Sequence, residues 1–363
     1  MSIWSTLRGH GEQQEMFRRS IRRQRLSQAY LFVGPAGIGK QQFARRLAQA
    51  LLCQKLGDDP LDPCGQCAGC KPYLAGSHPD FLYVGCPEGK RELPIALLVG
   101  SDERRGQEGL CHDLSLAPLP GSRKVAIVDD ADTMNDAAAN SFLKTLEEPP
   151  ERAILILIAS NLDALLPTIR SRCQLVRFPP LETADIGALL VEQQLAQSDE
   201  DIKFAAGLSE GSLNTAAQLL EPELRELRKQ LYRQLAQGNF AGLVLAKALI
   251  DGLGKISSET SVQRANSQWL IRFTIDFFRM TIWQLGYSTS GSNPENAEVS
   301  QFTNRIQSIP DCLELVGSLI ERTVEASSHI DQNVPVPLAI EALFQDLSRI
   351  LRIGITAESI PSR

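Results

Sequence analysis

The chain has 363 residues, which is enough for two or three domains that each bury a hydrophobic core. Its hydrophobic content of 43% and charged content of 22% are those of an ordinary water-soluble globular protein, and its net charge of −6 excludes a surface that attracts nucleic acid everywhere. The longest apolar run, residues 153–159, is too short to span a bilayer, and the first residues lack the apolar stretch of a signal peptide. We therefore expect a cytoplasmic protein whose eight cysteines are reduced thiols or metal ligands.

Five arginines lie close together in the early segment "RRSIRRQR", residues 18–25. Phe17 and Ile21 are one helical turn apart, which predicts a helix with most of these arginines on its outer face. A solvated helix face is the usual meaning of such a charge run. A contact with a phosphate backbone inside a larger assembly is the alternative.

The first half of the sequence alternates apolar strands with amphipathic helices. Strands are predicted at "AYLFVG", "KVAIVDD", "AILILIAS" and "QLVRF", and helices at "QQFARRLAQALL" and "NDAAANSFLKTLEEPP". Apolar strands separated by helices predict a parallel sheet with helices on both faces. The predicted fold class is therefore α/β.

The segment after the first predicted strand, "GPAGIGKQ", matches the phosphate-binding loop G-x-x-x-x-G-K-[S/T] except at its last position. Gly34, Gly37 and Gly39 permit a backbone whose N–H groups surround a phosphate, and Lys40 would reach the β and γ oxygens. Gln41 replaces the hydroxyl residue that ligates Mg²⁺. Its longer side chain is a poor ligand for a small cation that requires short octahedral bonds.

The second half of such a site is a strand that ends in acidic residues, here "VAIVDDAD". Asp129 occupies the position of the Mg²⁺-organising aspartate. Asp130 occupies the position where an active ATPase usually carries a glutamate that orients the attacking water. Because Asp130 is one methylene shorter than glutamate, we expect a nucleotide-type fold without turnover. The retained Lys40 is compatible with binding of ATP or ADP.

Four cysteines are spaced as a metal site: Cys53, Cys64, Cys67 and Cys70. Two C-x-x-C steps share a cysteine, and a fourth thiol lies upstream, so the set can close a tetrahedral structural Zn²⁺ site. A redox-active C-x-x-C pair is the alternative. The remaining cysteines have no such spacing and are expected to be small buried residues: Cys86, Cys111, Cys173 and Cys312.

The strand signals stop after the Pro-Pro pair at residues 179–180. We predict a P-loop domain over residues 1–179 with a zinc module at about 53–80, a small helical lid over 180–220, and an all-helical domain over 221–363. A polar linker between helices of the last domain is predicted at residues 286–298.

This combination resembles the clamp-loader subunits of bacterial DNA polymerase III, within the AAA+ class, and specifically the delta-prime type. The resemblance runs through "RLSQAYLFVGPAGIGK", the cysteine insert with its trailing "AGSHPDF", "RKVAIVDDAD", "AAANSFLKTLEEPP" and "TIRSRCQLVRF", and continues weakly into "HIDQNVPVPLAIEAL". It implies an AAA+ module with a zinc insert, a small helical lid, and a C-terminal helical collar that joins the subunits into a hetero-pentameric ring.

The resemblance also implies a largely passive subunit that supplies Arg172, within "SRC", to the ATP site of a neighbouring motor subunit. An arginine acting in this way is worth about 10³–10⁵ in rate. Motor relatives would carry Ser or Thr at position 41, Glu at 130, and an arginine in the lid near Asn214. The implied partners are the other clamp-loader subunits and, through the complex, the sliding clamp and primed DNA, with no membrane involved.

Three other functions remain as alternatives. The first is an active ATPase motor of the same architecture, and the residue type at position 41 distinguishes it from the non-motor subunit. A free-standing zinc-dependent nucleic-acid-binding protein is disfavoured by the acidic balance and by the lack of a basic groove with aromatic residues. A small-molecule P-loop kinase is disfavoured because "SRC" and the helical C-terminal third supply no acceptor site.

One segment departs from the family pattern. Residues 93–115 carry extra length between the cysteine insert and the acidic strand. Their central part, "GSDERRGQEG", is polar and rich in turn formers, so a longer surface loop is expected there.

Overall fold

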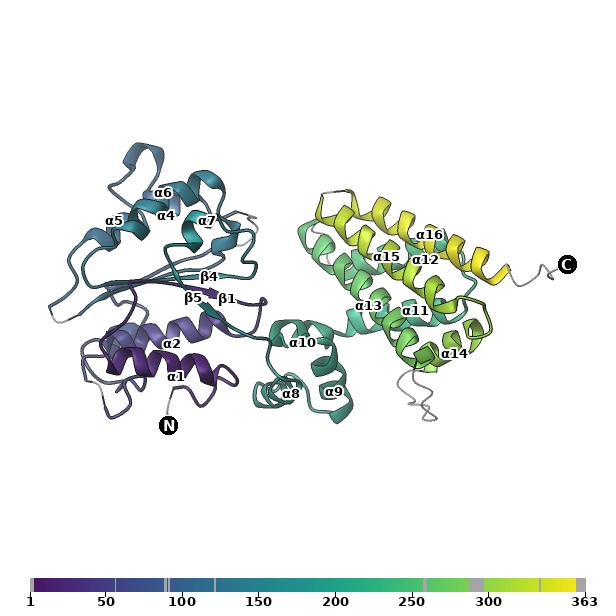
Figure 1. The fold of residues 1–363 in the computed structure, drawn as a ribbon, viewed down its shortest axis with the longest axis horizontal. Coiled ribbons are helices and arrows are strands. Elements are labelled where there is room, and N and C mark those ends of the chain that lie inside the picture. The colour runs from purple at the N-terminus through teal and green to yellow at the C-terminus, as the bar shows by residue number, and fades with distance from the viewer. Residues whose placement is uncertain are drawn as a thin grey trace. The chain divides into compact units, whose positions relative to one another are not determined.

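The structure, a computed structural model, describes residues 3–55, 57–87, 90, 92–120, 122–256, 260–286, 297–332 and 334–356. The chain divides into two compact units, residues 1–219 and 220–363 (Figure 1). Most of the linker predicted at residues 286–298 lies outside the described residues.

A five-stranded parallel sheet forms the centre of the first unit, in the order β2-β3-β4-β1-β5. Its strands are β1 (Ala29–Val33), β2 (Phe81–Val84), β3 (Lys124–Val128), β4 (Ala153–Ala159) and β5 (Gln174–Arg177). Every residue of β1, β3 and β4 is buried, as their continuous apolar sequences require in a sheet that is covered on both faces. The predicted parallel α/β fold is confirmed. The edge strand β2, which is partly exposed, was not predicted.

Helices cover both faces of this sheet (Figure 1). One face carries α1 (Gly11–Arg22) and α2 (Lys40–Leu52), and the other carries α4 (Ile95–Val99), α5 (Leu110–Ser115), α6 (Asp136–Glu147) and α7 (Pro167–Arg170). The short helix α3 (Cys70–Leu74) begins at the last cysteine of the insert. Phe17 of α1 is fully buried against Tyr30 of β1 and Phe43 of α2, with ring centroids 5.0 and 5.8 Å away.

The surface loop expected at the polar centre of residues 93–115 is present, with residues 101–107 exposed between two short helices. The helices α4 and α5 flank a 3₁₀ turn at Asp102–Arg104. Leu98, Leu110 and Leu114 are almost completely buried in the main core of the unit. The loop expectation thus agrees with the structure at the polar centre, and the two flanking helices were not predicted. Each helix spans fewer than two turns and buries only one or two leucines, which is too short for a clear helical period.

Three further helices complete the first unit: α8 (Thr183–Glu192), α9 (Asp199–Leu208) and α10 (Leu213–Leu219). They pack against one another, and Ile186, Leu190 and Ala205 are fully buried. Ser198 caps α9, because its hydroxyl accepts a hydrogen bond from the Asp201 backbone N–H.

The described residues of the second unit form only helices: α11 (Pro222–Ala236), α12 (Gly242–Ile256), α13 (Thr260–Gly286), α14 (Ala297–Ile306), α15 (Cys312–Asp331) and α16 (Val336–Thr356). The long helix α13 contacts each of the other five, as its apolar residues on most sides predicted. On α16, Ile340, Phe344 and Leu347 are fully buried. Among the described helices of both units, none is long and apolar enough to cross a membrane.

Candidate functional site

The glycine loop connects the end of β1 to the start of α2. Gly37 and Gly39 have φ values of +74° and +96°, a backbone region that disfavours residues with a Cβ. A Cβ on Gly34 would lie 2.1 Å from the carbonyl oxygen of Phe178, so the strand end has no room for a side chain there. The predicted loop glycines therefore occupy positions that require glycine.

Lys40 begins α2 and is buried, with 6% of its surface exposed. Its Nζ donates hydrogen bonds to the carbonyl oxygens of Gly34 at 2.5 Å and Pro35 at 2.6 Å. Burial lowers the pKa of Lys40, while the nearby carboxylates of Asp129, Asp132 and Asp130 act in the opposite direction. The ammonium group is thus held inside the loop, where a phosphate would be bound.

Gln41 and Asp129 meet at the position where a P-loop site places its cation. The Gln41 Nε2 donates to Asp129 Oδ2 at 2.7 Å and lies at the same distance from the hydroxyl oxygen of Tyr83. The Tyr83 hydroxyl in turn donates to Asp129 Oδ2 at 3.1 Å. The structure therefore brings together two predicted site residues and adds Tyr83, which sequence reasoning missed.

Asp130 follows directly at the end of β3 and has a left-handed backbone, with φ of 51°. Burial raises the pKa of its carboxyl group, and the neighbouring charges of Asp129 and Asp132 add to this effect. Asp132 has another role, because its Oδ2 accepts hydrogen bonds from the backbone N–H groups of Ser160 at 2.9 Å and Asn161 at 2.8 Å. This carboxylate ties the loop after β4 to the loop after β3.

A cavity of about 320 Å³ lies over the glycine loop, within the first unit. Its walls come from three places: the loop with the ends of β3 and β4, the first residues of the chain (Thr6, Leu7 and Arg8), and the helices α8 and α10 (Leu189, Gln193, Leu213 and Asn214). The Leu213 backbone N–H donates to the Gly37 carbonyl oxygen at 3.1 Å. A Cβ on Gly37 would lie 2.8 Å from the Cβ of Asn214. Asn214 therefore lies against the loop, near the position where motor relatives were expected to carry an arginine.

His10 is a second residue beside this site that sequence reasoning missed. It is buried, with 6% exposure, and its Nε2 lies 2.8 Å from the carbonyl oxygen of Ile38 in the glycine loop. Its ring packs edge-on against Phe178, with centroids 5.0 Å apart. Burial lowers the pKa of His10. The sequence around His10 contains no pattern that predicts its contact with the glycine loop.

Arg172 lies just beyond α7, away from the cavity. Its guanidinium forms an ion pair with Glu147 of α6 and donates to the carbonyl oxygen of Thr168 at 2.8 Å. About 31% of the side chain is exposed, and Arg172 is not among the described residues that line the cavity. The adjacent Cys173 is half-buried, and burial raises the pKa of its thiol to about 12.

The four predicted metal ligands converge on one point. The sulfur atoms of Cys53, Cys64, Cys67 and Cys70 all lie within 4.8 Å of one another, and those of Cys53 and Cys67 are 3.9 Å apart. This spacing suits thiolates around one tetrahedral ion with Zn–S bonds of about 2.3 Å. A Cβ on Gly69 would lie 2.1 Å from the carbonyl oxygen of Leu52, so the chain closes tightly around the cluster. The set is arranged as a potential metal site and fits zinc.

Comparison with known proteins finds relatives that match about half to two thirds of the chain. Residues 9–182 match the family model described as the DNA polymerase III delta subunit. The chain is 35% identical over 230 residues to the DNA polymerase III subunit delta-prime of Pseudomonas aeruginosa, and 37% identical over 177 residues to that of Bacillus subtilis. The chain is thus similar to the delta-prime subunits of DNA polymerase III. The matched regions cover 63% and 49% of this chain, and 63% and 50% of the respective relatives.

A more distant likeness reaches a solved structure. A DNA polymerase III gamma-subunit-related protein from Thermotoga maritima covers 94% of this chain and 100% of its own, with 18% identity and a TM-score of 0.42. The parallel sheet with a glycine loop after β1, followed by helices, agrees with the fold that the sequence resemblance implies.

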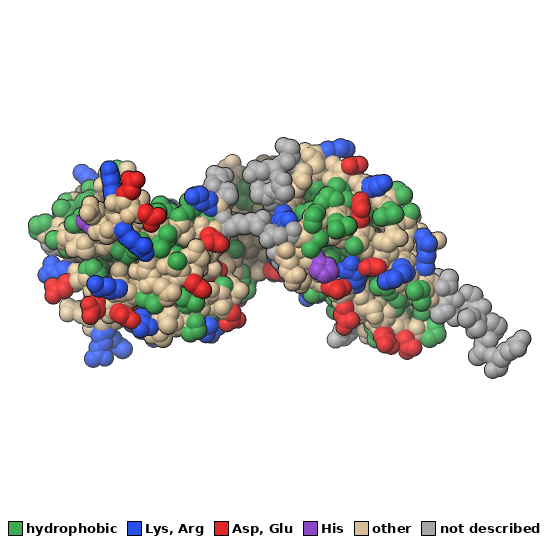
Figure 2. Space-filling view, turned by 90° about the horizontal axis from the view of Figure 1, so that it is seen from above, with side chains coloured by type: hydrophobic (Ala, Val, Ile, Leu, Met, Phe, Trp, Pro, Cys, Tyr) green, Lys and Arg blue, Asp and Glu red, His purple; other side chains and the backbone are tan. Residues whose placement is uncertain are grey.

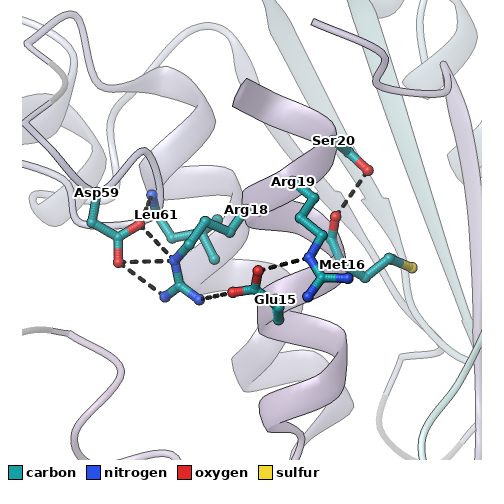
Figure 3. Close-up of polar contacts among 7 residues, drawn as sticks. All are labelled: Glu15, Met16, Arg18, Arg19, Ser20, Asp59 and Leu61. Carbon is teal, nitrogen blue, oxygen red and sulfur yellow. Dashed lines mark hydrogen bonds and ion pairs between the residues drawn. The ribbon is translucent and has the colours of Figure 1, made fainter. Parts of the chain in front are cut away.

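The cysteine insert is fastened to α1 by one arginine of the predicted cluster. Arg18 forms a two-pronged pair with Asp59, through Nε at 3.0 Å and Nη2 at 2.9 Å (Figure 3). Glu15 lies between Arg18 and Arg19 and pairs with both. The predicted helix with outward arginines is present, and Arg18 connects it to the insert.

Buried Leu61 gives the cysteine insert a second attachment to the rest of the unit. Leu61 is fully buried, and its backbone N–H donates to Asp59 Oδ1 at 3.0 Å. The carbonyl oxygen of Leu61 accepts a hydrogen bond of 2.7 Å from the indole Nε1 of Trp4. The chain between Cys53 and Cys64 is therefore anchored to α1 and to the first residues of the chain.

Proposed function

We propose that this chain is a non-motor subunit of the bacterial replicative clamp loader, within the DNA polymerase III holoenzyme. In this role it completes the ATP site of a neighbouring motor subunit by supplying Arg172. The complex then loads the sliding clamp onto primed DNA. Similarity to DNA polymerase III delta-prime subunits supports the proposal at the level of the complex.

The position of Arg172 is the observation that carries the proposal. A guanidinium that stabilises charge on a transferring phosphoryl group must reach that group directly. Arg172 does not line the cavity beside Lys40, so it is poorly placed to act on a nucleotide in its own chain. Its partly exposed side chain, at the end of a surface helix, suits contact with a nucleotide held by another subunit.

The chemistry at the chain's own loop supports a passive role. Gln41 offers no hydroxyl to a cation, and its amide group donates to the carboxylate that would organise that cation. Asp130 replaces glutamate at the position of the water-orienting group, and Asn214 stands at the expected lid position. We propose that ATP or ADP bound at Lys40 is not hydrolysed.

The assembly role is assigned to the helical parts of the chain. We propose that α8, α9 and α10 act as the lid and that the second unit acts as the collar that joins the other clamp-loader subunits. Basic and acidic side chains are interspersed on the face shown in Figure 2. Such a mixed surface supports contact with DNA through the complex rather than by this chain alone. The proposed location is the cytoplasm.

We further propose that the four-cysteine cluster binds one structural Zn²⁺. Four thiolates leave no coordination position for a substrate, so the metal would stabilise the insert and take no part in catalysis. Two buried members, Cys53 and Cys70, would be poor redox partners for external thiols, because thiol exchange requires access.

An active motor of the same architecture is the second candidate. It is favoured by the retained Lys40 and Asp129 and by the cavity above them. It is also favoured by a similarity of 32% identity over 206 residues to the DNA polymerase III subunit tau of Bacillus subtilis. This candidate requires turnover by the chain alone.

The deciding experiment measures ATP hydrolysis by the chain alone and by rebuilt clamp-loader complexes. We expect the chain alone to be inactive, and Arg172→Ala to lower turnover of the complex by about 10³-fold or more at the site it completes. Arg170→Ala is the matched control, because Arg170 is an exposed arginine two residues away that pairs only at the surface with Asp163. If the chain alone hydrolyses ATP and Arg172→Ala has no effect in the complex, this subunit is a motor.

A further inference from the structure

The cation position of the P-loop is filled by side chains of the protein itself. An amide nitrogen has two hydrogens, so Gln41 Nε2 can donate to both Asp129 Oδ2 and the Tyr83 hydroxyl oxygen. The Tyr83 hydroxyl has one hydrogen, which it donates to the same carboxylate oxygen. The three groups form a closed triangle in which every hydrogen has an acceptor.

The orientation of Gln41 is set by its partner. An ionised carboxylate only accepts hydrogen bonds, so the amide nitrogen, and not the amide oxygen, must face Asp129. A Mg²⁺ ion requires oxygen ligands at about 2.0–2.1 Å in octahedral geometry, and amide N–H groups occupy that space here. The residues present therefore do not fit the cation that P-loop sites of this class employ.

Tyr83 is held in place by its surroundings. It lies on the edge strand β2, paired in register with Ile127 of β3, two residues before Asp129. The guanidinium carbon of Arg45 lies 4.5 Å from the centroid of its ring. A Cβ on Gly85 would lie 3.0 Å from the Tyr83 hydroxyl oxygen, so the glycine leaves room for the phenol to reach Asp129. Burial and the Asp129 charge both raise the pKa of Tyr83, which keeps the hydroxyl protonated as a donor.

Two carboxylates at the site accept hydrogen bonds from backbone N–H groups. The Asp132 carboxylate is occupied by the N–H groups of Ser160 and Asn161. The second oxygen of Asp129 accepts from the backbone N–H of Asp130 at 3.1 Å. Lys40 keeps its ammonium group in the loop, next to a cavity of about 320 Å³. What remains is a lysine-containing phosphate cradle beside Asp129 and Asp132, both of which already accept hydrogen bonds.

We propose that Gln41 and Tyr83 replace the divalent cation, so that this pocket binds the polyphosphate of a nucleotide without metal. The inference rests on the proposed non-motor function, because a P-loop that has exchanged its cation for hydrogen bonds retains binding and loses catalysis. A site of this kind would hold a nucleotide as a structural ligand between the glycine loop and α10.

The test measures binding of a fluorescent ADP analogue to the full chain, with Mg²⁺ and with EDTA. We expect the same Kd in both conditions for the wild type. In the double variant Gln41→Thr and Tyr83→Phe, a hydroxyl faces an uncovered Asp129, and we expect Mg²⁺ to tighten binding by about tenfold or more. Gln307→Thr removes an exposed glutamine of the second unit and serves as the matched control.

Each result of the binding test supports or overturns the proposal of metal-free binding. Wild-type binding that requires Mg²⁺, or no binding in either condition, would overturn the proposal. A double variant that stays indifferent to Mg²⁺ would show that Gln41 and Tyr83 do not replace the cation. The single variants Gln41→Thr and Tyr83→Phe separate the two side chains if the double variant folds poorly. None of these results bears on Arg172, whose role is measured by turnover of the complex.

Discussion

The guanidinium of Arg172 is paired with the carboxylate of Glu147, which joins the loop after α7 to the last residue of α6. A further bond from Arg172 to the Thr168 carbonyl oxygen fixes the other end of the planar group. The arginine proposed to act on a neighbouring subunit is therefore oriented before assembly. Preorientation of this kind limits the number of side-chain conformations that must be lost when the complex forms.

We expect Glu147→Gln to lower ATP turnover of the rebuilt complex, but by less than Arg172→Ala, because the guanidinium remains and only its orientation is loosened. The isolated chain should lose no more than about 1 kcal/mol of stability, since both partners are partly exposed. Steady-state hydrolysis and thermal unfolding measure the two effects.

Glu148→Gln changes the neighbouring exposed glutamate and is the matched control. Equal losses from Glu147→Gln and Glu148→Gln would contradict a positioning role for Glu147.

The cysteine cluster yields a prediction about metal content. Purified protein should contain about one zinc per chain. Cys70→Ser, which removes a fully buried ligand, should abolish the bound metal and lower the Tm, because the metal-binding free energy is part of the folding free energy of the insert. Elemental analysis and calorimetry check both results.

Cys312→Ser in the second unit should leave the zinc content unchanged, since Cys312 is no part of the cluster. Metal-free protein that is fully folded would rule out a structural zinc site.

The sequence was most informative where a signal is continuous along the chain. The buried strands β1, β3 and β4, the glycine loop and the cysteine spacing were all readable, because each requires particular residue types at fixed positions. The edge strand β2 was missed because it is short and partly exposed, so it lacks an uninterrupted apolar run.

Some residues of the site could not be predicted from the sequence for a different reason. Tyr83 reaches Gln41 and Asp129 only because β2 pairs with β3, and the sequence separation is 42 residues to one partner and 46 to the other. Glu147 meets Arg172 across 25 residues through the packing of α6 against α7. Contacts of this kind depend on strand order and helix packing, which no local pattern specifies.

The ion pair between Arg18 and Asp59 gives a prediction about the insert. Asp59→Asn should cost about 1 kcal/mol or less, because 38% of the Asp59 side chain is exposed and water screens the pair. The Arg18 guanidinium lowers the pKa of Asp59, so the pair stabilises the fold above the unfolded pKa of about 3.9. That contribution is lost as the pH falls through the lower, folded pKa.

Chemical unfolding of the wild type and Asp59→Asn over an acidic pH series measures this difference. The two curves should approach each other as the pH falls. A constant gap between them at every pH would show that the carboxylate charge is not what holds the insert.

His10 should make the first unit sensitive to mild acid. Burial lowers its folded pKa below the unfolded value of about 6.5, so above that pH both states are neutral and His10 adds no pH dependence. Below it, the unfolded state binds a proton that the folded state resists, and stability falls until the pH reaches the folded pKa. His10→Gln keeps an amide that can donate to the Ile38 carbonyl oxygen and cannot titrate in this range.

We therefore expect the wild type to lose stability relative to His10→Gln as the pH is lowered from about 6.5, with no relative change above it. His112→Gln is the matched control, because His112 lies on α5, outside the cavity walls. Thermal unfolding across this pH range supplies the comparison. If the wild type and His10→Gln lose stability in parallel, the prediction is wrong. The imidazole would then become protonated without opening its packing between Ile38 and Phe178.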